Sequence, residues 1–594
     1  MKRSRSPRHE RKNSREKRRI WKRGDGRLFI VGLAFIVAWA GMGFRLFDLQ
    51  GAQAVELATR GFNQRIREAA IPAPRGTIYD RDGVEFALTV DGWNVVVDPQ
   101  LLDDPAEVAS VLAQFSGRDV STLTSDLIEA QSTGSRYEEI AVRIRNDQKA
   151  IIVGVVDEAE LVGVFYRAVP LRIYPAGSVA AQVIGLTRYD DGAGIEGLEK
   201  AFDSELVGDP GRLIVERDPY GRVIPQGETL VDPAIPGSDI VTTIDREIQY
   251  AAEQALAAAV ERTNAIGGSV VVMNPESGEI LAMANWPAVD LNDRSSYDAE
   301  AMRNRAATDI FEPGSTLKTV TISAALEEGV VTPDTPIDTP RTVTIGEFDY
   351  TDHGYNPPWM PVKDVVKKSS NVGTIEIERR LGRELHYQYL TEFGLGSTAS
   401  VDVEGERYGA LLPTSQWNNT TGSSIGIGYA IGTTAIQMAA VYSTIANDGV
   451  WTEPFLVKEI RPPSGAPIVT RPRTRTVLSP ETAQTMRWML GRVVEDNGTG
   501  RRAYMDAYTA GGKTGTTNKF DTDLGQYVEA TNASFIGMAP LDDPKVVVAI
   551  VMDSPSGLGP DGVELNLGGA SAAPVFKEIA EAALHQLGVP PDRN

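Results

Sequence analysis

Residues 311–318 read Phe-Glu-Pro-Gly-Ser-Thr-Leu-Lys, a turn followed by the start of a helix that is predicted to run to about Glu328. Ser315 and Lys318 are three positions apart, so they share one helical face, with the serine near the positive end of the helix dipole. A lysine whose pKa is lowered by burial or by a second cation can take the proton of a serine hydroxyl. The stretch therefore predicts a serine nucleophile with a lysine base.

This spacing is uninformative alone, because Ser-x-x-Lys is expected by chance about once or twice in such a chain. It recurs at Ser14 and Lys17. Two further elements follow in order, however: Ser369-Ser370-Asn371 and then Lys513-Thr514-Gly515. An ordered trio of this kind is far rarer than its first member and indicates a serine acyltransferase.

Composition excludes the rival nucleophile systems. The chain has no cysteine, which removes disulfides, zinc thiolate sites and cysteine nucleophiles. Of the four histidines, only His353 and His386 lie away from the chain ends, and neither sits in a recognisable motif of a Ser-His-Asp hydrolase. No metal and no cofactor is expected.

A domain built on one sheet is predicted around the trio. Its expected elements are two strand pairs on either side of a long helical insertion, with a helix at each end. In chain order they are helix 244–262, strands 269–273 and 279–284, strands 533–538 and 545–552, and helix 574–587. The sheet would thus be assembled from both ends of the domain, with helices packed on it.

A second, irregular α+β region precedes this domain. The turn-rich stretch 231–237 marks the boundary between the two. The expected elements before it are helix 49–62, strands 93–97 and 211–216, and helices 105–115 and 148–160.

The N-terminus predicts a membrane anchor. Residues 1–27 carry thirteen Lys or Arg against three Asp or Glu, although the whole chain has a net charge of −21. A basic tail can indicate nucleic-acid binding, but here an apolar run, residues 28–44, follows at once and can cross a bilayer if Arg45 snorkels. We therefore predict a single-pass anchor, a cytoplasmic N-terminus, a body on the outer side of the membrane and no nucleic-acid partner.

A cleaved signal peptide is the competing interpretation, because Ala38-Trp39-Ala40 has the small-x-small form of a cleavage site. The basic segment is unusually long for a signal peptide, and the apolar stretch continues past Ala40 to Phe47. Both features favour an uncleaved anchor.

From residue 49 to residue 587 the chain resembles a class B penicillin-binding protein, with Ser-Ser-Asn in place of Ser-Asp-Asn. Other stretches similar to that family are 75–83, 172–177 and 194–199 before the boundary, and 304–306, 426–437 and 533–537 after it. Arg75, Asp80 and Arg81 are expected to form structural ion pairs.

The resemblance implies an α+β fold in several parts. These are a basic cytoplasmic tail (1–27), a transmembrane anchor (28–48), an elongated α/β pedestal for dimerisation or partner binding (49–236), a transpeptidase domain (237–588) and a short C-terminal tail (589–594). The transpeptidase domain would hold a mixed antiparallel sheet flanked by helices, as in serine β-lactamases.

The resemblance also implies a role for each residue of the first two motifs. Ser315 would attack the penultimate D-Ala carbonyl of a peptidoglycan stem peptide and release the terminal D-Ala, with Lys318 as its base. Ser369 would pass a proton to the leaving amine. Asn371 would bind the acyl side of the substrate and orient Lys318.

The third motif would bind the other end of the substrate. Lys513, Thr514 and Thr516 would lie on an edge strand and hold the terminal carboxylate, while Gly515 lets the substrate approach. The backbone N–H groups of Ser315 and Thr516 would form the oxyanion hole.

Aminolysis is favoured over hydrolysis of the acyl-enzyme. A class A β-lactamase needs a Glu-x-x-x-Asn loop between the second and third motifs, and residues 372–512 show no clear equivalent; Glu564-Leu565-Asn566 comes after Lys513, in the wrong order. A penicillin-sensing receptor would usually need a cytoplasmic effector, where only a short basic tail is seen. A scaffold protein with a dead site is disfavoured by the intact trio.

Within class B, the chain looks more like the division-specific, septal type than the elongation type, from its modest length, its short C-terminal tail and the stretch 218–224. No glycosyltransferase domain fits before the boundary. The implied partners are peptidoglycan stem peptides, β-lactams, a polytopic glycosyltransferase of the shape, elongation, division and sporulation family (FtsW-type) and other membrane proteins of the division machinery, at midcell in the inner membrane.

Overall fold

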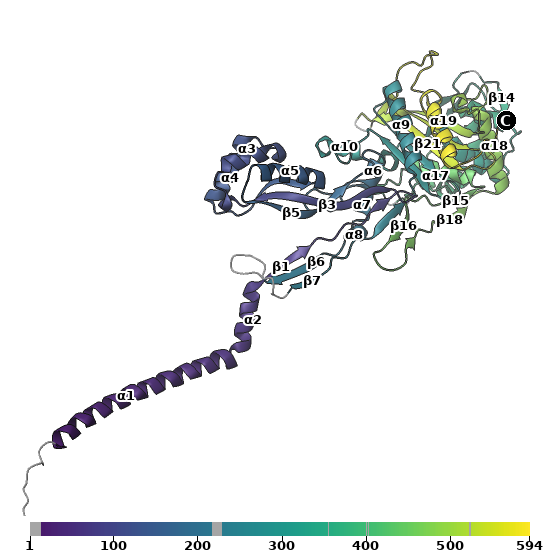
Figure 1. The fold of residues 1–594 in the computed structure, drawn as a ribbon. Helices are drawn as coiled ribbons and strands as arrows, with labels where there is room; N and C mark the ends of the chain where they lie inside the picture. The colour runs from purple at the N-terminus through teal and green to yellow at the C-terminus, as the bar shows by residue number, and fades with distance from the viewer. Residues whose placement is uncertain are drawn as a thin grey trace, which may run out of the picture. The chain divides into compact units, whose positions relative to one another are not determined.

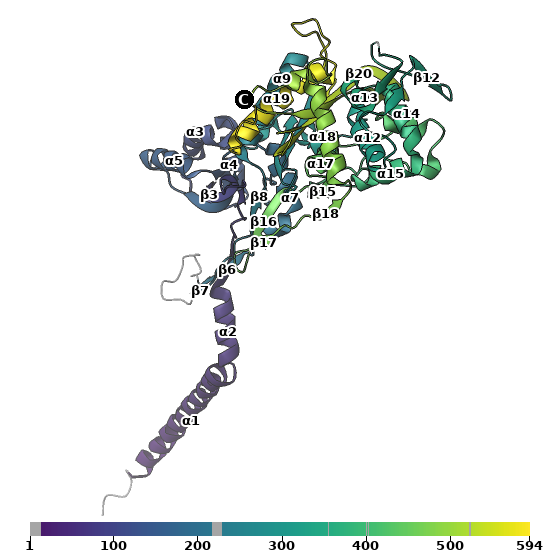
Figure 2. The same ribbon diagram turned by 90° about the vertical axis from the view of Figure 1, so that its right-hand side faces the viewer.

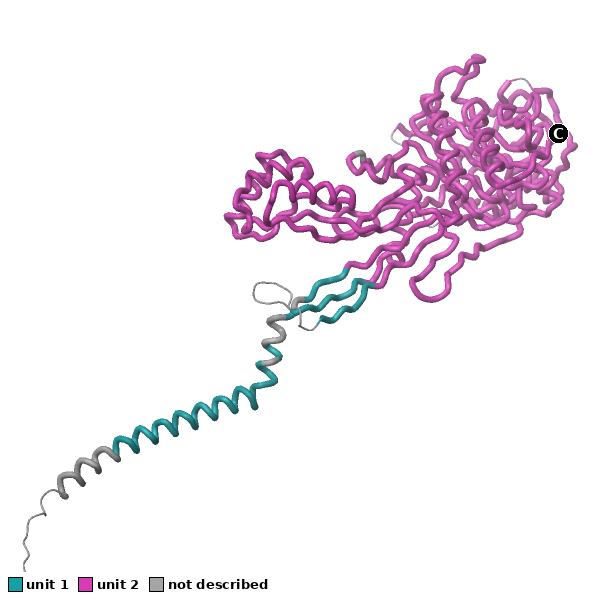
Figure 3. The backbone as a smooth tube through the Cα atoms, viewed as in Figure 1, with its two compact units in different colours: residues 1–71, 210–234 teal, residues 72–209, 235–594 magenta. Residues whose placement is uncertain are grey.

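The computed structural model describes residues 14–216, 229–354, 356–399, 401, 403–521 and 524–593. The chain divides into two compact units (Figure 3), residues 1–71 with 210–234 and residues 72–209 with 235–594. The basic tail before Ser14 and the stretch 218–224 lie outside the described residues.

The first unit begins with a long helix, α1 (Ser14–Phe47), which is followed by a π-helical turn (Asp48–Ala52) and by α2 (Ala54–Arg65) (Figure 1). In the described part of the chain, Gly26–Ala52 is the one segment long and apolar enough to cross a membrane. This finding supports the predicted single-pass anchor. The helix predicted from residue 49 begins at Ala54 instead, because the π-helical turn intervenes.

A small antiparallel sheet completes the first unit. Its order is β1-β6-β7, and its strands are β1 (Ile66–Ile71), β6 (Gly211–Glu216) and β7 (Thr229–Asp232). The predicted strand 211–216 is confirmed as β6.

One of the two large sheets in the second unit joins distant parts of the chain. Its order is β17-β16-β8-β2-β3-β4, and β5 also pairs with β3. The strands are β2 (Ile78–Tyr79), β3 (Glu85–Val97), β4 (Glu138–Ile144), β5 (Val164–Ile173), β8 (Asp239–Thr242), β16 (Val457–Arg461) and β17 (Ile468–Val469). The first four come from the region that precedes the predicted boundary and the last three from beyond it.

Three helices share a core with β3 and β4: α3 (Pro105–Ser116), α4 (Val120–Ser132) and α5 (Asn146–Glu158). Each presents one apolar face, since its buried residues recur at helical spacing. The pairs are Val108 with Leu112, Leu123 with Leu127, and Ile152 with Val156. The predicted helices 105–115 and 148–160 are confirmed, with shifts of one or two residues at their ends.

Structural ion pairs were predicted for Arg75, Asp80 and Arg81. Arg75 does pair with the fully buried Glu199 (2.6 Å), which also pairs with Arg172 (2.7 Å). Arg81 pairs with Glu279 at 3.2 Å. The two arginine predictions are therefore confirmed.

The prediction for Asp80 is wrong. Its carboxylate accepts the backbone N–H groups of Asp82 (2.9 Å) and Val84 (2.8 Å), and it makes no ion pair with a described residue. Asp80 closes a turn, which is a common use of a short carboxylate side chain.

The second large sheet carries the candidate site. Its order is β10-β9-β21-β20-β19, all antiparallel, which confirms a sheet assembled from both ends of the domain. Its strands are β9 (Gly267–Met273), β10 (Ile280–Trp286), β19 (Gly511–Asp521), β20 (Gln526–Ala539) and β21 (Val546–Asp553). β19 is an edge strand, as expected for the third motif.

Both faces of this sheet are buried under helices (Figure 2). On one face Val270 and Val272 share a core with α9 (Arg246–Thr263) and α19 (Gly568–Gln586). On the other face Val271 and Met273 share a core with helices of the insertion. Because successive side chains of a strand point to opposite faces, one apolar strand serves two cores.

The insertion between β10 and β19 is mostly helical, as predicted. Its longer helices are α12 (Lys318–Glu327), α13 (Val362–Lys368), α14 (Asn371–Leu381), α15 (Arg383–Glu392), α17 (Ala435–Ala446) and α18 (Pro480–Val494). Its two-stranded sheets are β11 (Pro336–Asp338) with β14 (Trp359–Pro361), β12 (Thr342–Ile345) with β13 (Phe348–Thr351), and β15 (Val450–Thr452) with β18 (Thr474–Thr476).

Candidate active site

Ser315 lies in a single 3-10 turn, Gly314–Thr316, that leads into α12. The turn is held by buried polar contacts: Thr316 Oγ1 donates to Pro313 O (2.7 Å), and the Tyr442 hydroxyl donates to Thr316 O (2.9 Å). Every residue of α12 from Lys318 to Ala325 is buried. The candidate nucleophile therefore lies just before the N-terminal end of a buried helix.

Gly515 lets this turn approach the edge strand. A Cβ at position 515 would lie 2.8 Å from Pro313 O and would collide with the Ser534 side chain. Gly428 packs closely against the same turn: a side chain there would collide with Gly314 O, and its φ of 88° also favours glycine. Two glycines thus fix the position of Ser315.

Two buried lysines meet at Ser369. Lys318 Nζ donates to Ser369 O (2.7 Å) and Asn371 Oδ1 (2.7 Å) and lies 3.4 Å from Ser369 Oγ. Lys513 Nζ donates to Ser369 Oγ at 2.9 Å. The structure therefore brings the first, second and third motifs together.

Their burial changes how readily these lysines hold a proton. Burial lowers the pKa of Lys318 to about 7, against an opposing effect of the Asp352 carboxylate. Burial, and then repulsion by Lys318, lower the pKa of Lys513 well below its ordinary value. Because two full charges in one buried site repel each other, the pair can hold a neutral amine at neutral pH.

Ser369 has a strained backbone. It follows the last residue of α13 with a left-handed φ of 58°, a conformation that a non-glycine residue adopts at a cost of about 1–2 kcal/mol. The hydrogen bonds from both lysines hold it there. In this conformation the Ser369 hydroxyl lies 3.4 Å from Lys318 Nζ and 2.9 Å from Lys513 Nζ.

Asp352 is a site residue that sequence reasoning missed. Its carboxylate accepts from Ser370 Oγ (2.7 Å) and from the backbone N–H groups of Asn371 (2.6 Å) and Val372 (3.1 Å). Asn371 Nδ2 also donates to Thr351 O (2.9 Å). The carboxylate caps the start of α14 and holds the second motif. Asp352 follows β13 in a loop and is part of no recognisable sequence motif.

A cleft of about 600 Å³ opens over these groups. Ser315, Ser369, Thr514, Gly515 and Thr516 line it, so the predicted nucleophile and two of the three predicted carboxylate-binding residues face one space. The third, Lys513, is buried and is not part of the lining. The cleft is also lined by residues that sequence reasoning did not single out, namely His353, Lys368, Thr499, Arg501, Arg502, Val563, Leu567, Gly569 and Ala570. Ser315 Oγ makes no hydrogen bond with a described residue, which leaves it open to a substrate.

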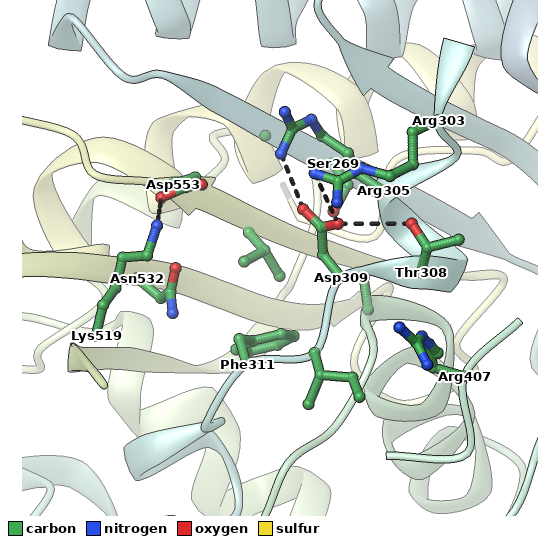
Figure 4. A pocket seen from close by; sticks show the side chains of 14 residues that line it. Ser269, Arg303, Arg305, Thr308, Asp309, Phe311, Arg407, Lys519, Asn532 and Asp553 are labelled. Atoms are coloured by element: carbon green, nitrogen blue, oxygen red, sulfur yellow. Dashed lines mark hydrogen bonds and ion pairs between the residues drawn. The ribbon is translucent and has the colours of Figure 1, made fainter. Parts of the chain in front are cut away.

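A separate cavity of about 350 Å³ lies beside the 304–306 stretch, with Arg303 and Arg305 in its lining. Figure 4 shows Asp309 between Arg303 and Arg305, at 3.3 and 2.9 Å. On β19, Lys519 pairs with Asp553 at 2.6 Å in the same cavity. Asn285 of β10 anchors the segment that precedes Ser315, because its Nδ2 donates to Asn304 Oδ1 (3.2 Å) and its Oδ1 accepts from the backbone N–H of Ala306 (2.9 Å). Among the residues that the structure describes, no group of His, Asp and Glu is arranged to hold a metal ion.

Comparison with known proteins agrees with this geometry. Residues 268–581 match the penicillin binding protein transpeptidase domain, and residues 70–242 match the penicillin-binding protein dimerisation domain. Penicillin-binding protein PbpB of Mycolicibacterium smegmatis is 34% identical over 606 residues, covering 96% of this chain and 91% of that protein. The probable peptidoglycan D,D-transpeptidase PenA of Neisseria meningitidis is 32% identical over 578 residues, covering 96% and 94%.

The solved structures agree as well. Penicillin binding protein 3 of Mycobacterium tuberculosis, complexed with ampicillin, is 30% identical with a TM-score of 0.68, covering 89% of this chain and 98% of that one. Fold and comparisons together define a serine-type penicillin-binding transpeptidase. The chain belongs to the class B penicillin-binding proteins, peptidoglycan D,D-transpeptidases that carry a dimerisation domain ahead of the transpeptidase domain.

Proposed function

We propose that the acyl-enzyme forms on Ser315. Lys318, held neutral by burial, takes the Ser315 proton as Oγ attacks the penultimate D-Ala carbonyl. Ser369 then delivers a proton to the departing D-Ala amine, and Asn371 keeps Lys318 in place. The observation that carries this proposal is the convergence of Lys318 and Lys513 on Ser369 beside a cleft lined by Ser315.

Substrate binding is assigned to the edge strand. Lys513, Thr514 and Thr516 hold the terminal carboxylate of the donor. Both threonines line the cleft, and Lys513 Nζ lies 3.5 Å from Thr514 Oγ1 on the same strand. The backbone N–H groups of Ser315 and Thr516 stabilise the oxyanion. Gly515 keeps the strand close enough to both.

β-Lactams are the inhibitors expected at this site. The support is the likeness to penicillin binding protein 3 of Mycobacterium tuberculosis, whose structure was solved with ampicillin. A β-lactam carbonyl would take the place of the D-Ala carbonyl and leave its acyl group on Ser315.

We expect Asp352→Ala to slow acylation by a fluorescent penicillin about 10- to 100-fold, because a hydrogen bond to a charged group contributes about 1.5–3 kcal/mol. The substitution frees the turn that holds Ser370 and Asn371. The rate is measured by labelling the full-length protein in detergent. Asp349→Ala is the matched control, since Asp349 is an exposed carboxylate of β13, three residues before Asp352, and accepts from Thr344 Oγ1. Equal rates in the two variants would show that Asp352 plays no part.

The division-specific, septal role is also part of this proposal, with the N-terminus in the cytoplasm, the catalytic domain in the periplasm and the protein at midcell. The sequence supports it through the likeness of residues 218–224 to the division type. The proposed domains remain the anchor (28–48), the pedestal (49–236) and the transpeptidase domain (237–588). A glycosyltransferase of the FtsW type is the proposed polymerising partner.

The septal role is tested by imaging a fluorescently tagged full-length copy in dividing cells of the source organism. Recruitment to midcell before constriction is the expected result. Dispersed labelling along the sidewall would assign the protein to elongation instead. A copy carrying Ser315→Ala serves as control, because recruitment through the anchor and pedestal does not need the nucleophile.

A further inference from the structure

A second hollow continues from the active-site cleft. Its volume is about 940 Å³, and it shares Arg501 and Arg502 with the cleft. Lys367 lines it and lies two residues before Ser369, at the end of α13. We call this hollow the basic groove; its lining is Lys367, Val494, Glu495, Asp496, Arg501, Arg502, Tyr504, Pro574, Lys577 and Arg593.

The basic groove is positively charged in an acidic protein. Five of its residues are Lys or Arg and two are Asp or Glu, whereas the whole chain has a net charge of −21. Both acidic residues are already paired, Glu495 with Lys367 at 3.5 Å and Asp496 with Arg501 at 3.2 Å. The lining residues alone therefore carry an excess of positive charge.

Of the three cations that remain, two have acidic neighbours outside the lining. Arg502 pairs with Asp561, which lies outside the groove lining. Lys577 has carboxylates no nearer than 3.9 Å, from Asp506 and Glu581.

Arg593 makes no ion pair with a described residue. Its guanidinium lies 4.3 Å from the ring centre of Tyr504, and its buried Nε has no hydrogen-bond partner among the described residues. A guanidinium held on an aromatic ring keeps its outer N–H groups free for a carboxylate.

The position of the groove matters for the second half of the reaction. Under the proposed function, the terminal D-Ala leaves as an amine next to Ser369, and an acceptor amine then attacks the acyl-enzyme. By microscopic reversibility, the entering amine follows the path of the leaving amine in reverse. The acceptor amine therefore enters the cleft where D-Ala leaves. Because Arg501 and Arg502 line both the cleft and the basic groove, the rest of the acceptor can extend into the groove.

We infer that the basic groove binds the acceptor strand, an uncross-linked peptidoglycan strand whose stem peptides carry free carboxylates. This inference rests on the proposed function. The amine nitrogen of the acceptor forms the new amide bond to the acyl carbon, the ester bond to Ser315 Oγ breaks, and the proton lost by the amine returns to Ser315 Oγ through Ser369 and Lys318. The cations bind carboxylates of the acceptor strand away from the reacting amine.

The test uses full-length protein in detergent and the double variant Lys577→Glu with Arg593→Glu, because these residues line the groove but not the catalytic cleft. Acyl transfer from a thioester analogue of the donor peptide is measured with two acceptors. One is uncross-linked peptidoglycan strands; the other is D-alaninamide, an amine without a carboxylate. Acylation by a fluorescent penicillin is measured in parallel.

In the double variant we expect the concentration of peptidoglycan strands that gives half-maximal transfer to rise about tenfold. In the wild-type protein, the preference for strands over D-alaninamide should shrink as salt screens the groove. Transfer to D-alaninamide and penicillin acylation should stay unchanged. The matched control reverses two exposed cations of the second unit that line neither space, Lys545→Glu with Arg461→Glu.

Unchanged strand transfer in the groove variant would overturn the inference, and so would an equal loss with both acceptors or an equal effect in the control. If the glutamate variant fails to fold, Lys577→Gln with Arg593→Gln is put through the same comparison. If the wild-type protein were not labelled by penicillin at all, the proposed function would be refuted instead, so the two failures are distinguishable.

Discussion

Replacing Ser315 by alanine is expected to abolish the covalent adduct that the full-length protein forms with benzylpenicillin. The proposed reaction joins Ser315 Oγ to the β-lactam carbonyl carbon while the ring C–N bond breaks, so the whole antibiotic adds to the chain. Intact-protein mass spectrometry should show the mass of one penicillin on the wild-type protein and none on Ser315→Ala. Cross-link formation should be lost with it.

Ser323→Ala is the control for this experiment. Ser323 lies in the same helix, α12, is fully buried, and has an Oγ without a hydrogen-bond partner among the described residues. Its removal tests whether the loss of any hydroxyl from this helix disturbs the site. A full adduct on Ser323→Ala with none on Ser315→Ala supports the assignment, and labelling that survives in Ser315→Ala would falsify it.

Acylation is expected to rise with pH through about 7 and then level off. Lys318 can accept a proton only as the neutral amine, and burial lowers its pKa to about 7. Below this pKa the neutral fraction, and so the second-order rate constant with penicillin, should fall about tenfold per pH unit; above it the rate should be constant. Because Lys318 and Lys513 interact, the measured value belongs to the pair.

Lys318→Met should lower the acylation rate about 100- to 10,000-fold and remove this pH dependence, since general-base catalysis typically contributes that much. Lys363→Met is the control, because Lys363 is an outlying lysine of α13 that pairs with Asp334. Lys318 would be ruled out as the base if Lys318→Met kept the wild-type pH profile, or if the wild-type profile were centred near the ordinary lysine pKa.

The two predictions together separate the nucleophile from its base. Loss of Ser315 removes the atom that carries the acyl group, whereas loss of Lys318 leaves that atom in place but raises the barrier. A slow, nearly pH-independent adduct on Lys318→Met would therefore be consistent with both assignments. It would also show that the oxyanion contacts accelerate the reaction without the base.

Much of the fold could be predicted from local patterns. The sheet strands, α9 and α19 follow from apolar periodicity and turn residues, which act over a few positions. The pairing of β8 with β16, more than two hundred residues away, could not be predicted, because nothing local in either strand specifies so distant a partner. For the same reason, the sequence did not predict that β16 (Val457–Arg461) joins one sheet with strands from before the predicted boundary.

The candidate site shows the same division. The three motifs are local, and their order alone pointed to Ser315, Lys318, Ser369, Asn371 and Lys513. Asp352 carries no motif, because its role depends on a loop that folds back onto α14. The basic groove likewise collects residues from α13, α18 and α19 and from two loops, so its charge is invisible in a chain with an acidic total.

The sequence by itself determined which residues can react, since a nucleophile, a base and their order are properties of side chains and spacing. It also determined the anchor and the class of fold, because apolar periodicity acts locally. Only the tertiary structure decided the state of those residues. Burial of Lys318 lowers its pKa, the left-handed backbone directs Ser369, and two glycines let the Ser315 turn close on β19. These effects depend on desolvation and close approach between distant segments, which no local pattern records.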